Sequence, residues 1–204
     1  MIALLTGLGL ASAAGLNAYI PILVVGFLGR YTDLVDLPSQ FSWMTSGWAL
    51  TIVSLLCAAE VVLDKVPIVD SANDMIQTFI RPTAGGAVMV ASTAAGQLDS
   101  SIGSSTFMGD NPWIGWVLGI AVALGVHATK TTIRPIANTG TLGAAAPVLS
   151  TVEDFFSLGM SVLAILAPVI GLILLVALLF SAIRLIGSAR RRKALRAARQ
   201  ASPG

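Results

Sequence analysis

The sequence predicts an all-α bundle of membrane-spanning helices, a polytopic membrane protein with about six spans. Its mean hydropathy is +0.86. Of its 204 residues, 55% are apolar and only 11% are charged, whereas roughly a quarter of the residues of a soluble domain are charged. Because a spanning helix needs ~20 apolar residues, the chain has room for several spans but not for an additional soluble catalytic domain.

A short motif occurs twice. Residues 78–84 are TFIRPTA and residues 131–137 are TTIRPIA, so both copies fit T-x-I-R-P-x-A. Each copy ends a polar stretch and precedes an apolar segment rich in Gly and Ala. In membrane transporters, matched short segments interrupted by Gly or Pro often mark a binding site. We therefore predict an internal repeat, about 47–98 and 113–150, within one transmembrane domain that covers residues 1–184.

The first predicted span covers residues 1–29. We expect it to bend near Asn17 and Pro21, because an interior proline removes a backbone hydrogen bond. Asn17 also needs a polar partner inside the bilayer. A polar loop follows, and the second predicted span covers residues 47–63.

Each Arg-Pro motif is predicted to start a short, slim helix, because proline suits the first helical turn. These helices are expected at 83–98, with Gly85-Gly86 near its start, and at 135–149. A surface helix at 72–79, after an N-cap at Asp70-Ser71, is expected before the first of them. The remaining spans are predicted at 113–127 and at 155–183, the latter interrupted at Pro168.

The distribution of basic residues predicts the topology. If there are six spans and both termini are cytoplasmic, every lysine and arginine except Arg30 falls on the cytoplasmic side, as the positive-inside rule requires. A four-span alternative with two re-entrant segments would place Lys130 and Arg134 outside. In the six-span arrangement the two Arg-Pro copies start helices of the same sense, which predicts a parallel repeat.

Charged residues gather toward the predicted cytoplasmic side. Glu60 lies inside the second predicted span, and ionisable groups at membrane depth usually pair or face a cavity. We expect acids to face bases there, with Glu60, Asp64, Asp70 and Asp74 opposite Lys65, Arg81, Lys130 and Arg134. Arg81 and Arg134 in particular are expected to face the carboxylates of residues 60–74.

Two interpretations of these charges remain open. They form either a network of ion pairs that ties the two repeats together, or a polar site in which Glu60 binds a cation or proton, or the arginines bind an anion. His127 is expected to be a hydrogen-bonding residue near a helix end, or else a group of the site that titrates near neutral pH. Asn17 and Asn138 are predicted intramembrane polar residues.

Glu153 and Asp154 are expected to cap the last helix, because acids favour helix N-termini. The chain has a single cysteine, Cys57, and a single histidine, too few for a disulfide or the usual zinc ligands. It has no P-loop, hydrolase or metalloprotease motif. We therefore expect no metal site, no cofactor and no enzymatic activity.

The end of the chain is basic. Residues 185–204 are predicted to be a cytoplasmic tail, which either attracts anionic lipid headgroups, at ~1 kcal/mol per basic residue, or acts only as a topology signal. Because half of the basic residues lie in this tail, the pI of 9.0 does not indicate binding to nucleic acid. The expected partners are the lipid bilayer and, as an open alternative, further copies in a homo-oligomer.

Several motifs occur together in this chain: Gly15-Leu16-Asn17-Ala18-Tyr19-x-Pro21, Glu60-x-x-x-Asp64-Lys65-x-Pro67-x-x-Asp70, Arg81-Pro82, His127-x-x-Lys130-x-x-x-Arg134 and Glu153-Asp154. In combination they resemble a family of multi-span bacterial membrane proteins known only as a domain of unknown function. The resemblance implies a membrane location and a similar span pattern, and it covers nearly everything except the tail. The Ala/Gly-rich composition with an Arg-rich tail is compatible with a high-GC bacterium, and we expect the protein in the inner (plasma) membrane.

These observations favour a small transporter or channel-like protein with a charged site on its cytoplasmic side. The alternative is a non-transporting membrane scaffold or assembly factor whose buried charges are structural. A water-accessible cavity that reaches Glu60 would favour transport, whereas a Glu60 enclosed by Arg or Lys would favour the scaffold.

Overall fold

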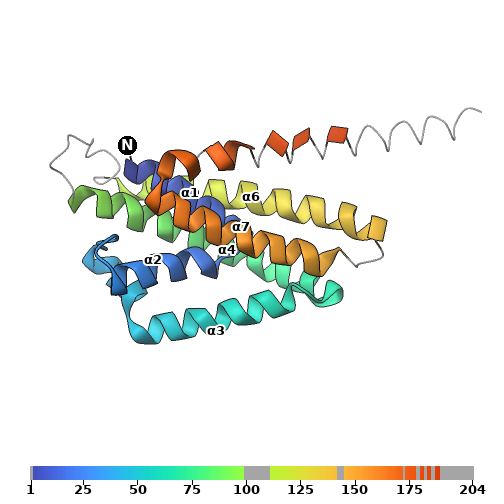
Figure 1. Ribbon diagram of the computed structural model, residues 1–204, viewed down its shortest axis with the longest axis horizontal. Helices are drawn as coiled ribbons and strands as arrows, with labels where there is room; N and C mark the ends of the chain where they lie inside the picture. Colours follow the sequence, from blue (N-terminus) through green and yellow to red (C-terminus); the bar gives the residue numbers. More distant parts are fainter. Residues whose placement is uncertain are drawn as a thin grey trace, which may run out of the picture.

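The computed structural model describes residues 2–98, 111–141, 145–171 and 173–177, and shorter pieces up to residue 188. The regular secondary structure of these residues is helical, which confirms the all-α prediction. Figure 1 shows the helices lying roughly along one common direction. They are α1 (Ile2–Leu16), α2 (Tyr19–Tyr31), the 3-10 helix η1 (Ser39–Thr45), α3 (Gly47–Leu63), α4 (Pro67–Leu98), α6 (Pro112–Thr141) and α7 (Ala146–Leu166).

The first two helices form a hairpin. Asn17 lies at its tip, where its Oδ1 accepts the backbone N–H groups of Tyr19 (3.0 Å) and Ile20 (3.2 Å), groups that a helix start otherwise leaves unsatisfied. Figure 1 shows α2 running back toward the end of the bundle where α1 begins. At ~1.5 Å per residue, α1 is only about 22 Å long, less than the ~30 Å of a bilayer core. The prediction of one bent span over residues 1–29 is therefore wrong.

Both Arg-Pro motifs lie inside continuous helices. Pro82 is inside α4 and Pro135 is inside α6, so the predicted surface helix at 72–79 and the separate short helices at 83–98 and 135–149 do not exist as such. Proline is tolerated inside membrane helices when neighbouring groups satisfy the freed carbonyl. The helices α4 and α6 also run antiparallel (Figure 1), so the expectation that the two copies share one sense is wrong. The internal repeat itself remains a prediction.

The last predicted span, 155–183, is likewise not one crossing. The helix α7 ends at Leu166, and Ala167 leaves the helical region with φ −148° and ψ 71°. Helix resumes at Pro168, the residue at which we expected an interruption. In Figure 1 the described residues after it turn back along the bundle.

Among the described residues, fewer helices are long and apolar enough to span a membrane than the six predicted. Pro112–Pro135 of α6 and Ala146–Leu166 of α7 are long and apolar enough to cross a membrane, and η1 with α3, bent by 60°, is a third candidate if the pair is one span. The difference arises because α1 and α2 are short and because the first half of α4 carries charged residues.

Glycines bring the central helices unusually close together. A Cβ on Gly119 of α6 would lie 2.4 Å from the carbonyl oxygen of Gly85 in α4, and a Cβ on Gly85 would lie 2.5 Å from the Cβ of Ala123. Small residues at such contacts let helix backbones approach in membrane proteins. The core of the bundle therefore depends on the absence of these side chains.

We expect Gly119→Ala to destabilise the protein by about 1–3 kcal/mol, the usual cost of overpacking, because a backbone oxygen has little freedom to move away. Gly125→Ala on the same helix is the matched control, since a Cβ there meets nothing within 4 Å. Thermal unfolding of the detergent-purified variants measures both. Equal melting temperatures for the two variants would contradict this account of the helix contact.

Candidate functional site

Charged side chains gather where α3, α4, α6 and α7 meet the tip of the α1–α2 hairpin. The innermost residues are almost inaccessible, each exposed by 4% or less: Glu60, Asp64, Arg81, Lys130 and Arg134. We call these residues, with the partners named below, the charge cluster. Buried charges are strongly destabilising unless they are paired and hydrogen-bonded, so the pairing decides what the cluster is able to do.

Asp64, directly after α3, is the hub of the cluster. Its Oδ2 accepts hydrogen bonds from Lys130 Nζ (2.9 Å) and Arg134 Nη2 (3.2 Å), and Arg81 Nη2 lies 3.5 Å away. Its Oδ1 accepts from Asn73 Nδ2 at 2.7 Å. Burial alone would raise the pKa of Asp64, but the three cations, Lys130 foremost, outweigh it and hold the pKa below its ordinary value. Asp64 therefore stays ionised.

Lys130 and Arg134 extend the cluster from α6 to other elements. Lys130 Nζ donates to the carbonyl oxygen of Leu16 at the end of α1 (3.3 Å) and lies 3.0 Å from Glu153 Oε2. Arg134 donates to both carboxylate oxygens of Glu153, from Nε at 3.2 Å and from Nη2, the bidentate geometry that makes such pairs strong. The prediction that Glu153 caps the last helix is wrong, because α7 already begins at Ala146 and Glu153 faces the cluster.

Arg81 joins Glu60 to His127. Its Nη2 donates to Glu60 Oε1 at 2.8 Å, and its Nη1 lies 3.0 Å from His127 Nδ1. Because arginine only donates, His127 Nδ1 must accept, so the proton of the neutral ring sits on Nε2 and is donated to Thr78 Oγ1 (3.0 Å). The expectation that His127 forms hydrogen bonds agrees with this geometry, but its expected place near a helix end is wrong, since α6 continues to Thr141.

A second set of contacts lies at the hairpin tip. Asn17 Nδ2 donates to Asp154 Oδ1 at 3.0 Å, which supplies the polar partner that we expected for Asn17. Lys65 Nζ lies 3.9 Å from Asp154 Oδ2, and the Lys65 side chain is 36% exposed. Lys65 thus lies at the rim, and Asp154, like Glu153, pairs within the bundle and does not cap a helix.

Most of the predicted site residues lie within this cluster. Asp74 Oδ1 completes it, 3.7 Å from Arg81 Nη1. The side chains of Asp70 and Asn138 lie outside the described residues. Sequence reasoning missed the roles of Glu153 and Asp154, and the available signal was the presence of two acids in an otherwise apolar segment. Asn73 and Thr78 carried no signal, because a hydrogen-bonding role for such common polar residues depends on the fold.

Oxygen acceptors outnumber donors among the unsatisfied atoms of this region. Among the described residues, four buried carboxylate or amide oxygens have no hydrogen-bond partner: Glu60 Oε2, Asp74 Oδ1, Gln77 Oε1 and Asp154 Oδ2. Two further buried atoms of the described residues are also unpartnered, the nitrogen Arg81 Nε and the hydroxyl oxygen Ser150 Oγ, which can donate or accept. Among the described residues, no group of His, Cys, Asp and Glu is arranged to hold a metal ion. Within the described part of the cluster, unpartnered acceptor oxygens are therefore more numerous than unpartnered donors.

We expect Arg81→Ala to destabilise the protein by about 3–5 kcal/mol, because it leaves Glu60 as an uncompensated buried charge. Arg81→Lys should recover only part of this, since lysine does not reach two partners as a fork does. Folded yield and chemical unfolding in detergent measure both. Arg30→Ala, which removes an exposed arginine bonded to the Thr45 carbonyl, is the control and should cost about 1 kcal/mol. Similar losses for Arg81→Ala and Arg30→Ala would contradict the pairing.

Comparison with known proteins agrees with one part of the resemblance drawn from the motifs, namely a domain of unknown function that covers most of the chain. No curated protein and no solved structure matches the chain. Residues 4–188 match a family described as "Domain of unknown function (DUF4126)". Because this match spans most of the chain and includes the whole charge cluster, the protein belongs to the DUF4126 family of domains of unknown function.

Proposed function

We propose that this protein is an integral membrane protein that conducts or carries protons, with Glu60 as the group that binds them. One observation carries the proposal. Glu60 is 2% exposed, its Oε1 pairs with Arg81, and its Oε2 has no hydrogen-bond partner among the residues that the structure describes. A buried carboxylate with one free oxygen is a natural acceptor for a proton, and intramembrane acids mark proton relays in pumps and transporters.

The pairing of the arginines disfavours an anion as the transported species. Arg134 binds Glu153 through both carboxylate oxygens, and Arg81 binds Glu60 and His127. An anion would have to displace carboxylates that are already well placed. A proton needs no such rearrangement, and the surplus of acceptors favours it.

The broken α1–α2 hairpin supports a transport role. Irregular backbone at membrane depth is tolerated where it is buried in protein or lines a polar cavity, and discontinuous helices form the binding sites of many transporters. Here the break brings the Leu16 carbonyl oxygen to Lys130. The hairpin tip therefore contributes backbone to the charge cluster, and the proposal includes no enzymatic step or cofactor.

The proposed orientation in the plasma membrane follows from the basic residues. Lys65 follows α3 at the end of the bundle where α4 begins, and Lys130 and Arg134 lie in the part of α6 nearest that end. The positive-inside rule assigns this end to the cytoplasm. The first residues of α1 lie at the opposite end (Figure 1), so we propose a non-cytoplasmic N-terminus in place of the cytoplasmic one expected from six spans.

Single cysteines introduced into a Cys57→Ser background test this orientation. Ile2→Cys and Val66→Cys replace exposed residues, 71% and 46% accessible, at opposite ends of the bundle. A membrane-impermeant maleimide added to intact cells should label the first and not the second. The reverse pattern, or equal labelling of both, would show that this assignment is wrong.

A structural role is the second candidate, and a specific observation favours it. Arg81 encloses Glu60 on one side and is itself fully buried, which is the arrangement that we expected of a scaffold. In that case the charge cluster only fixes the positions of the helices. The membrane protein would then serve assembly, not transport.

Proton flux into proteoliposomes separates the two candidates. With a pH-sensitive dye inside the vesicles, the wild type should dissipate an imposed pH gradient faster than protein-free vesicles, and Glu60→Gln should reduce the rate to that background. Asp33→Asn, at an exposed position, is the matched control and should retain the wild-type rate. Wild-type flux no faster than background would reject proton transport in favour of the scaffold.

A further inference from the structure

One face of α4 leads from the surface of the bundle to its innermost charges. Asp74, Gln77 and Arg81 follow one another at intervals of three and four residues, a spacing that places side chains on the same side of a helix. Gln77 and Arg81 are buried, whereas Asp74 is half-buried. Burial therefore increases along this face, from Asp74 toward Arg81 and its partner Glu60.

Arg81 lies between two carboxylates. Its Nη2 donates to Glu60 Oε1 at 2.8 Å, and its Nη1 lies 3.7 Å from Asp74 Oδ1. The two carboxylates are therefore one guanidinium group apart, although they belong to different helices, α3 and α4. The Asp74 side chain is 15% exposed and the Glu60 side chain only 1%. Asp74 is thus the carboxylate of this pair that solvent reaches.

Polar atoms without a hydrogen-bond partner lie along the same path. Within the described part of the chain they include the acceptors Asp74 Oδ1, Gln77 Oε1 and Glu60 Oε2 and the donor Arg81 Nε. A buried water molecule binds where about two to four polar groups surround it. Three acceptors and one donor on neighbouring side chains meet that requirement, so this face is suited to hold water between Asp74 and Glu60.

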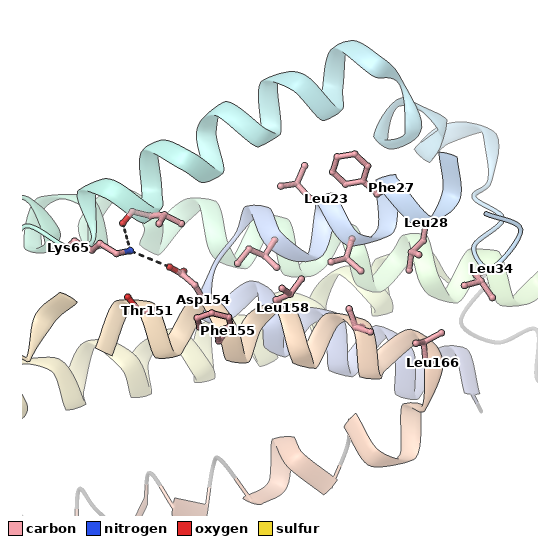
Figure 2. A pocket seen from close by; sticks show the side chains of 14 residues that line it. Leu23, Phe27, Leu28, Leu34, Lys65, Thr151, Asp154, Phe155, Leu158 and Leu166 are labelled. Carbon is pink, nitrogen blue, oxygen red and sulfur yellow. Dashed lines mark hydrogen bonds and ion pairs between the residues drawn. The ribbon is translucent and has the colours of Figure 1, made fainter. Parts of the chain in front are cut away.

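Two other routes to Glu60 are less suitable. From the exposed Thr78, hydrogen bonds lead through His127 to Arg81, but a guanidinium group does not deprotonate in proteins and cannot pass a proton on. The groove between α2 and α7 is lined mainly by apolar side chains (Figure 2), and Glu60 is not among the described residues that line it. The face of α4 that carries Asp74 is therefore the better route.

We propose that Asp74 is the proton relay between the cytoplasm and Glu60, by way of water held at Gln77. Asp74 takes up a proton from solvent at the end of the bundle where α4 begins, the end assigned to the cytoplasm. Its carboxyl group gives this proton to a bridging water molecule, which gives one of its own to Glu60 Oε2. Asp74 is then ionised again and the water is regenerated. This inference rests on the proposed proton transport and adds the residue through which the proton enters.

Proton flux in proteoliposomes tests the relay. Asp74→Asn removes the transferable proton with little change in size and should slow the flux at least about tenfold, since a positioned proton-transfer group contributes ~10²–10⁴-fold to a rate. Gln77→Met removes the polar atoms that hold the water and should also slow it. Asp36→Asn, at an exposed position, is the matched control and should retain the wild-type rate. Unchanged flux in a folded Asp74→Asn or Gln77→Met protein would overturn the proposal.

The variant Asp74→His separates a relay from a mere partner of Arg81. Histidine carries a proton but cannot neutralise arginine, so it should restore flux relative to Asp74→Asn. The pH of half-maximal flux should also rise, because the ordinary pKa is about 6.5 for histidine and about 3.9 for aspartate. The charged and titratable groups around position 74 are Arg81 on α4, His127 on α6 and Glu60 on α3, and these variants retain all three. Flux in Asp74→His as slow as in Asp74→Asn would overturn the relay.

The outcomes also separate this inference from the proposed function. Melting temperatures of the detergent-purified variants show which of them are folded, and the variants at positions 74 and 77 give independent readings of the path. Wild-type flux no faster than that of protein-free vesicles would overturn both proposals. Wild-type flux that is lost in Glu60→Gln but unchanged in Asp74→Asn would overturn the relay alone.

Discussion

The arrangement of the helices depends on one buried negative charge, the carboxylate of Asp64, and on the cations that neutralise it. Lys130 and Arg134 of α6 hydrogen-bond to its Oδ2 and Arg81 of α4 lies close to the same atom, while Asn73 binds the other oxygen. Removing one partner from such a site leaves an uncompensated charge at a cost of several kcal/mol. Two long helices and the turn after α3 must therefore meet at a single point for any of these charges to be buried.

The break between α1 and α2 depends on the same cluster of charged residues. A helix that ends inside the bundle leaves free carbonyl groups, which must find donors, and Lys130 supplies one to Leu16 while it also binds Asp64. This contact requires α1 to lie close to α6, and Gly15 permits it, since a Cβ there would lie 2.6 Å from the Ala123 carbonyl oxygen. Polar pairing and small residues thus determine the hairpin together.

The sequence predicted the helical class and the members of the charge cluster better than it predicted the helix boundaries. Ionisable residues inside a membrane protein usually pair with one another. The scarcity of charged residues in this chain was therefore enough to predict that Glu60 and Arg81 lie close together. The predicted helix boundaries were wrong at Pro82, Pro135 and Asn17, because the local sequence at these residues is compatible with more than one backbone conformation. Whether proline starts a helix or lies inside one, and whether a polar residue bends or reverses the chain, depends on partners from distant helices, which no local pattern reveals.

Within the charge cluster, the number of hydrogen bonds that each carboxylate accepts distinguishes a structural role from a chemical one. The oxygens of Asp64 are fully engaged, so protonation of Asp64 would weaken its contacts to both α4 and α6 at once and destabilise the site. Glu60 and Asp154 differ, because within the described part of the chain each binds one partner tightly through one oxygen and its second oxygen accepts no hydrogen bond. A group that is half-bound gains or loses a ligand with little rearrangement, since its position is already fixed by the other oxygen. The saturated hub therefore holds the fold, and in the proposed function it is the half-satisfied carboxylate of Glu60 that accepts a proton.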